Sequence, residues 1–311
     1  MSAAARPALA LAAPGAELRE DLAACAALAR AHYENFAIGS LLLPRRLRLP
    51  LAAIYAVVRI ADDLADEGAG GSEAAAAIDA WERDLERAVA GEPVGHFALR
   101  ACAAVIREHA LPLEAFRALF RAFRRDTTQS RYRSYEELLG YCRDSADPVG
   151  RLVLGLFGVR DARLFAASDA ICSGLQLVNH WQDVAADARR GRLYLPLEDL
   201  SRFGVAPEAV LEGRDGAALR ALLGFETARA RELLERGGDL VAETHGRLRL
   251  EVALFRRGGL AACDALERAG YAVLAGPPHL GAADRARVLF RGLLDFATGA
   301  RRGALAPRVA A

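Results

Sequence analysis

Lysine is absent from this chain, so arginine supplies all 41 of its basic side chains. The 40 acidic residues nearly balance them, and the formal net charge is +1. A chain with so small a net charge has no overall field that would attract a polyanion. This argues against nucleic acid as a partner, although arginine does suit planar, two-point contacts with single phosphate groups.

Cysteine is also scarce. The five cysteines are scattered and form no CxxC pair, which excludes a disulfide framework and a cysteine zinc site. Reduced thiols are typical of the cytoplasm, where we expect the protein to reside. No apolar run reaches the roughly 18 residues that a spanning helix needs. No amphipathic anchor stands out either, so membrane contact would be peripheral.

Strand patterns and nucleotide-binding motifs are missing too. No segment alternates between apolar and polar residues as a half-buried strand does. The chain has no P-loop, no glycine-rich dinucleotide fingerprint and no GxSxG elbow. A nucleotide cofactor therefore has no visible binding site.

Helical periodicity is what the sequence does contain. It predicts helices over about residues 17–31, 48–66, 73–90, 95–109, 113–126, 134–144, 147–158, 161–188, 215–245, 248–274 and 283–298. Pro44 and Pro50 bracket the entry to the second helix, Asp161 is placed to cap the eighth, and 201–216 is a looser connector. Since composition does not divide the chain, we predict one all-α domain over residues 17–300, with tails at 1–16 and 301–311.

The first cluster of functional side chains lies near the end of the 48–66 helix. Tyr55, Arg59, Asp62 and Asp66 fall at i, i+4, i+7 and i+11, which places them in one stripe. Asp63 lies about a hundred degrees away, either solvated or paired with Arg59. The acidic residues could simply form a polar helix end. However, carboxylates near a helix C-terminus oppose the helix dipole, so a cation is the more natural explanation.

A second acidic block follows far downstream. Gln176, Asn179, Asp183 and Asp187 share one stripe of the helix predicted over 161–188. Here the alternative is a solvated face paired with the arginines that follow. Each block alone is a weak signal, but together they favour Mg²⁺, which prefers carboxylates, water and substrate phosphates. We therefore predict that both blocks face one central cavity and bind a diphosphate through metal ions.

Further polar residues flank these blocks. Arg192 and Tyr194 follow the second block and could point back toward a phosphate, with arginine giving bidentate contacts. Residues 141–150, Tyr-Cys-Arg-Asp-Ser-Ala-Asp-Pro-Val-Gly, interrupt a helix, which could let a ligand approach the backbone or be only a kink. His180 is beside the second stripe but off it, which favours a packed or supporting role over metal ligation.

Three motifs together resemble the squalene/phytoene synthase family of head-to-head prenyl transferases, across about residues 25–300. They are Tyr-x-x-x-Arg-x-x-Asp-Asp-x-x-Asp at 55–66, Asn-x-x-x-Asp-x-x-x-Asp at 179–187 and Arg-x-Tyr-x-Pro at 192–196. The resemblance implies an isoprenoid-synthase helical bundle around a central cavity and a prenyl diphosphate substrate. The metal ligands that it implies are Asp62, Asp66, Asn179, Asp183 and Asp187. The implied catalytic residues are Tyr55, Arg59, Tyr141, Arg192 and Tyr194, and the implied substrate contacts are His32, Asn35, Phe36 and Gln176.

Within the family, the chain resembles the hydroxysqualene synthases most. Asn35-Phe36 stands where other members have Ser-Phe, and residues 145–148 read Ser-Ala-Asp-Pro instead of Val-Ala-Gly. A family tyrosine is replaced around Gly258-Gly259, while Tyr271 aligns with a later one. These features imply Mg²⁺-dependent ionisation of presqualene diphosphate. The resulting cation would rearrange in an apolar tunnel, and water would capture it to give hydroxysqualene without NADPH.

Two alternatives remain. The first is condensation of two prenyl diphosphates into presqualene diphosphate, squalene or phytoene. The second is a helical assembly factor that keeps the fold without catalysis, although such a protein should have lost its metal ligands. If the chain is a hydroxysqualene synthase, a presqualene diphosphate synthase would have to supply its substrate.

Overall fold

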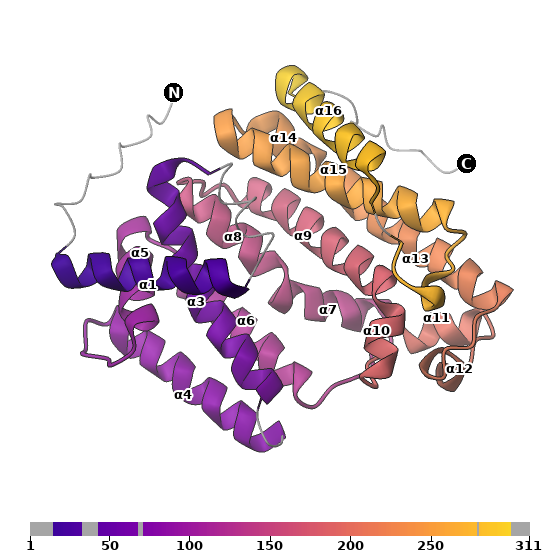
Figure 1. The fold of residues 1–311 in the computed structure, drawn as a ribbon, viewed down its shortest axis with the longest axis horizontal. Coiled ribbons are helices and arrows are strands. Elements are labelled where there is room, and N and C mark those ends of the chain that lie inside the picture. The colour runs from indigo at the N-terminus through magenta and orange to yellow at the C-terminus, as the bar shows by residue number, and fades with distance from the viewer. Residues whose placement is uncertain (1–14, 33–42, 68–70, 279, 300–311) are drawn as a thin grey trace.

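The computed structural model describes residues 15–32, 43–67, 71–278 and 280–299, and their regular elements are helical (Figure 1). The helices are α1 (Ala16–His32), α3 (Arg45–Glu67), α4 (Gly71–Val89), α5 (Phe97–His109), α6 (Leu113–Asp126), α7 (Tyr135–Ser145), α8 (Asp147–Leu156), α9 (Ala162–Gln182), α10 (Val184–Arg189), α11 (Leu197–Arg202), α12 (Pro207–Leu211), α13 (Ala217–Arg236), α14 (Gly238–Glu243), α15 (Gly246–Arg268) and α16 (Ala282–Thr298), with a 3₁₀ turn at η1 (Val273–Ala275). The described ranges contain no strand, only an isolated parallel bridge between Arg131 and Leu193. The all-α prediction is confirmed.

Local chemistry explains several helix boundaries. The Asp161 side chain accepts a hydrogen bond from the backbone N–H of Arg163, so the predicted cap of α9 is confirmed. The start of α3 was predicted too late, because the helix begins at Arg45 and contains Pro50. Pro50 is the sixth residue of the helix and lacks the N–H that would bond to the carbonyl of Arg46, yet the helix continues through it.

Two long helices that the periodicity predicted are interrupted. The helix expected over 161–188 breaks at Asp183, between α9 and α10. The helix expected over 215–245 breaks at Gly237, between α13 and α14. There a Cβ on Gly237 would lie 2.1 Å from Cγ1 of Ile171, so a side chain at this break would collide with α9. The connector predicted over 201–216 contains the end of α11 and all of α12.

Two hydrophobic clusters form the core. The first joins α1, α3, α4, α5 and α6, and the second joins α7, α9, α13 and α15. Helices α6 and α8 contribute to both, with Phe120 and Leu152 in the first cluster and Ala122 and Leu154 in the second. Because α3 belongs to the first cluster and α9 to the second, the two acidic blocks begin on helices of different clusters.

The described helices extend from Ala16 to Thr298. The division into a domain at 17–300 and tails at 1–16 and 301–311 stays a proposal, since residues 1–14 and 300–311 lie outside the described ranges.

Candidate active site

The first acidic block lies at the C-terminal end of α3. Nη1 of Arg59 lies 3.1 Å from Oδ2 of Asp62, and Nη2 of Arg59 pairs with Asp63. Asp63 is therefore paired with Arg59, the second of the two possibilities that the sequence left open. The backbone of Asp66 belongs to α3, but its side chain lies outside the described part of the structure.

The second block spans the joint between α9 and α10. Gln176 and Asn179 lie on α9, Asp183 is the residue between the helices, and Asp187 lies on α10. The backbone N–H of Asp183 donates to the carbonyl of Asn179, and that of Asp187 to the carbonyl of Asp183, both at 2.9 Å. The three ligand candidates therefore remain one turn apart, although the helix is not continuous.

In the second block, the ionised form of both aspartates is disfavoured by their surroundings. Burial, and then the neighbouring charge of Asp183, raise the pKa of Asp187 to about 6, while Arg192 and Arg190 oppose that rise. Burial also raises the pKa of Asp183. Two partly desolvated carboxylates one helical turn apart favour the binding of a cation between or beside them.

Asp126, which no sequence motif singled out, joins the two blocks. This last residue of α6 accepts a 3.0 Å hydrogen bond from the hydroxyl of Tyr141. Burial, and to a smaller extent the charge of Asp62, raise the pKa of Asp126 to about 6, and the charge of Arg192 opposes this rise. Asp126 therefore interacts with the first block through Asp62, and Arg192 links it to Asp187 in the second. The two blocks converge on one region.

A signal for Asp126 was present in the sequence. It is an aspartate at the C-terminal end of a helix, where it opposes the dipole just as Asp62 does. Its Oδ1 is buried and accepts no hydrogen bond within the described residues. An unsatisfied buried carboxylate oxygen is unusual and marks a site that another group can fill.

Aromatic rings form a wall beside these carboxylates. The ring of Tyr194 stacks on that of His180 at 3.7 Å between centroids, and Tyr141 lies 5.9 Å from Tyr194. Burial lowers the pKa of His180 to about 3, so the imidazole is neutral at physiological pH. Nε2 of Gln176 lies 3.3 Å from Nε2 of His180. His180 thus has the packed, supporting position that its place off the stripe predicted.

The segment after α10 is fixed by backbone contacts to the α6–α7 loop. The N–H of Leu193 donates to the carbonyl of Ser130 at 2.8 Å, and that of Leu197 to the carbonyl of Tyr132 at 2.9 Å. These bonds hold Arg192 and Tyr194 beside Asp187, and all three side chains line one small cavity. That Arg192 and Tyr194 point toward a phosphate stays a prediction.

The donors present suit magnesium. Within the described ranges, no three His, Cys, Asp or Glu side chains gather into a group that could hold a metal ion. The available donors are carboxylates of both blocks and the amide oxygen of Asn179, and Mg²⁺ completes such partial sets with water and phosphate oxygens. The residues therefore fit an ion that binds together with an anionic ligand.

Several predicted residues cannot be placed. Asn35 and Phe36 lie outside the described residues, and His32 ends α1 with a side chain that is also outside them. The predicted interruption within 141–150 is a break between two helices, since α7 ends at Ser145 and α8 begins at Asp147. Asp147 turns toward α9, where its Oδ1 accepts a 2.7 Å hydrogen bond from Ser173.

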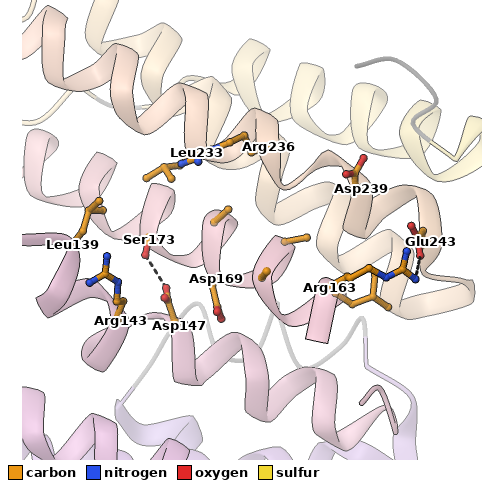
Figure 2. Close-up of a pocket in the computed structure, with 14 residues that line it drawn as sticks. Leu139, Arg143, Asp147, Arg163, Asp169, Ser173, Leu233, Arg236, Asp239 and Glu243 are labelled. Carbon is orange, nitrogen blue, oxygen red and sulfur yellow. Dashed lines mark hydrogen bonds and ion pairs between the residues drawn. The ribbon is translucent and has the colours of Figure 1, made fainter. Parts of the chain in front are cut away.

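A larger cavity, of about 560 Å³, lies apart from the acidic blocks (Figure 2). It is bounded by α7, α9, α13 and α14, and its charged lining includes Arg143, Asp147, Arg163 and Asp239. None of the metal ligands, catalytic residues or substrate contacts predicted from the sequence lines it.

The fold and the paired acidic blocks define an enzyme of the isoprenoid-synthase class. The model of the squalene/phytoene synthase family matches residues 29–289. The crystal structure of squalene synthase HpnC from Alicyclobacillus acidocaldarius is 42% identical, with a TM-score of 0.80, and the match covers 85% of this chain and 98% of that one. Hydroxysqualene synthase from Rhodopseudomonas palustris is 37% identical over 72% of this chain and 76% of its own length. Phytoene synthase from Thermus thermophilus is 33% identical over 90% of this chain and 94% of its own length. The chain belongs to the squalene/phytoene synthase family.

Proposed function

We propose that this enzyme is a hydroxysqualene synthase, which converts presqualene diphosphate and water into hydroxysqualene and diphosphate. The observation that carries the proposal is the 37% identity to the hydroxysqualene synthase from Rhodopseudomonas palustris over 72% of the chain. The unusual sequence of residues 145–148 supports it.

The diphosphate would bind between the two acidic blocks. In this proposal Asp62, Asp66, Asn179, Asp183 and Asp187 hold Mg²⁺, which neutralises negative charge on the departing diphosphate. Two arginines add positive charge beside these ligands. Arg59 is already paired with Asp62, and Arg192 lowers the pKa of Asp187. Each guanidinium can therefore reach a phosphate without leaving the site.

The aromatic wall suits a carbocation. When the substrate C–O bond breaks, its electron pair leaves with the diphosphate and a cyclopropylcarbinyl cation remains. The ring faces of Tyr141, Tyr194 and Tyr55 can stabilise positive charge. Because burial lowers the pKa of His180 to about 3, the ring under Tyr194 adds no competing positive charge. Apolar walls would protect the cation from early capture by solvent.

Capture of the rearranged cation by water forms a new C–O bond and releases a proton. Asp126 is the carboxylate we assign to accept that proton. Its Oδ1 accepts no hydrogen bond within the described part of the chain, and its pKa of about 6 suits an acceptor at neutral pH. Substrate contacts by His32, Asn35, Phe36 and Gln176 remain part of the proposal and rest on the resemblance of their motifs.

The proposal also has consequences for the cellular setting. No reduction takes place, so no NADPH is needed. A presqualene diphosphate synthase must supply the substrate, and we place the enzyme in the cytoplasm.

A second candidate is condensation of two prenyl diphosphates. The phytoene synthase from Thermus thermophilus favours it, because its match extends over 90% of this chain. The non-catalytic alternative loses support, since the chain belongs to an enzyme family and both acidic blocks are present.

Product analysis separates the two candidates. Purified enzyme is incubated with Mg²⁺ and either presqualene diphosphate or prenyl diphosphates, with and without NADPH, and the products are identified by mass spectrometry. We expect hydroxysqualene from presqualene diphosphate, independent of NADPH. Formation of squalene or phytoene from prenyl diphosphates, with presqualene diphosphate left unconverted to the alcohol, would refute the proposal.

A further inference from the structure

Helix α16 packs on the bundle through its charged side. Both carboxylates on this helix point toward α15: Asp295 lies 2.6 Å from Nε of Arg257, and Asp284 lies 2.9 Å from Nη2 of Arg268. Between them Gly292 is buried, and a Cβ there would lie 2.5 Å from Cδ2 of Leu254. In Figure 1, α16 lies along α15 at the outer edge of the molecule. The ion pairs and the buried glycine thus define the inner face of α16.

The opposite face of α16 is apolar and exposed. The exposed fractions are 53% for Leu289, 69% for Phe290, 46% for Leu293, 51% for Leu294 and 36% for Phe296. With a turn of 100° per residue, these five side chains occupy one arc of about 160°. Helices of globular proteins normally turn such a stripe toward the core, so this orientation is reversed. Contiguous exposed apolar surface of this kind marks an interaction site.

Arginines border the apolar arc. By the same helical geometry, Arg285 lies at one edge and Arg287 and Arg291 at the other, and Arg287 also pairs with Asp284 at 3.3 Å. The only acidic residues of the helix are the two that point inward. The outer side of α16 therefore combines apolar side chains with positive charge.

We propose that α16 is an interfacial helix that seats the enzyme on an anionic lipid surface. An exposed apolar face with a cationic border matches the two attractions that hold such helices, burial among acyl chains and attraction to acidic headgroups. A second copy of the chain fits less well, because a two-fold interface would place the cationic borders of the two copies against each other. None of the described helices is long and apolar enough to cross a bilayer, which leaves binding parallel to the surface.

This inference does not depend on the proposed function. The sequence analysis recognised a periodic helix over 283–298 but no anchor, because periodicity alone does not reveal which face turns outward. The contacts of α16 with α15 show which face of α16 turns inward and which turns outward.

Vesicle binding tests the proposal. The full chain is sedimented with vesicles of phosphatidylcholine alone or mixed with phosphatidylglycerol, at low and high salt. We expect the wild type to bind the anionic vesicles, with binding weakened by salt, and to bind neutral vesicles poorly. The double variant Phe290→Glu, Leu293→Glu should bind at least about tenfold more weakly, since burial of one such side chain alone accounts for a factor of this size.

The control is Phe255→Glu, which makes the same chemical change at a residue of α15 that is 55% exposed. It should bind within about twofold of the wild type. Far-UV circular dichroism and light scattering accompany each measurement, to report folding and oligomeric state. Equal vesicle binding by the folded double variant and the wild type would overturn the proposal. So would a wild type that binds no vesicles and forms a dimer that the double variant abolishes.

Discussion

Replacing Asp126 with asparagine should stabilise the substrate-free protein at neutral and higher pH. The pKa of this carboxyl rises from its ordinary value of 3.8 to about 6, chiefly through burial. A rise of about two units corresponds to about 3 kcal/mol, at 1.36 kcal/mol per unit, by which the ionised carboxylate destabilises the fold. An amide carries no such penalty, and its oxygen can still accept the hydrogen bond from Tyr141.

The sign of the pH dependence follows from linkage. Well below pH 3.8 the carboxyl is protonated in both the folded and the unfolded chain, so Asp126 costs nothing there. As pH rises toward 6, the unfolded chain loses this proton first, and stability falls until the folded carboxyl also ionises. The stabilisation by Asp126→Asn should therefore be smallest near pH 4 and reach its limit, up to about 3 kcal/mol, above pH 6.

Urea unfolding at a series of pH values, in the presence of EDTA, measures this effect. Tyr141→Phe provides the comparison, because it removes the hydroxyl that lowers the pKa of Asp126. In the wild-type background its cost should grow with pH, and in the Asp126→Asn background it should not. If Asp126→Asn destabilises the protein at pH 8, or if its effect is the same at pH 4.5 and pH 8, the burial and charge assigned to Asp126 are wrong.

Three further predictions test the site and the packing that supports it. Asp183→Asn should abolish turnover of the prenyl diphosphate substrate in a folded protein, whereas Asp169→Asn, on α9 in the lining of the larger cavity, should retain it; steady-state assays and circular dichroism decide. Gly174→Ala should destabilise by about 1–3 kcal/mol because its Cβ would lie 2.9 Å from Cγ of Leu234, while Gly140→Ala, with no atom within 4 Å, should be neutral or stabilising; thermal unfolding of the pair compares them. Arg229→Met should cost about 3–5 kcal/mol in urea unfolding at pH 7, since it leaves the buried carboxylate of Asp199 without its cation; a loss below 1 kcal/mol would contradict this.

Much of the fold follows from local sequence. The helix predicted over 113–126 has those bounds in the structure, because an amphipathic pattern starts directly after Pro112 and ends in a basic turn. Breaks inside long periodic segments were not predictable in the same way. The break at Gly237 reflects the approach of Ile171 from another helix, and periodicity within one segment carries no trace of that contact.

The spacing of the acidic residues predicts ligand candidates without coordinates, because residues one turn apart share a helix face. Their role as metal ligands stays a prediction, and their surroundings were harder to predict. Asp126 was missed because its raised pKa comes from burial and from Asp62, which lies on another helix. The neutrality of His180 likewise depends on tertiary burial rather than on its neighbours in sequence.

Calorimetric titration of inorganic diphosphate into the enzyme tests most directly whether the two acidic blocks act as one site. We expect tight binding only when Mg²⁺ is present, and loss of that binding in Asp62→Ala and equally in Asp183→Ala, with the double variant no worse than either. Mg²⁺-dependent binding that survives in one of the single variants would contradict a site shared between the two blocks.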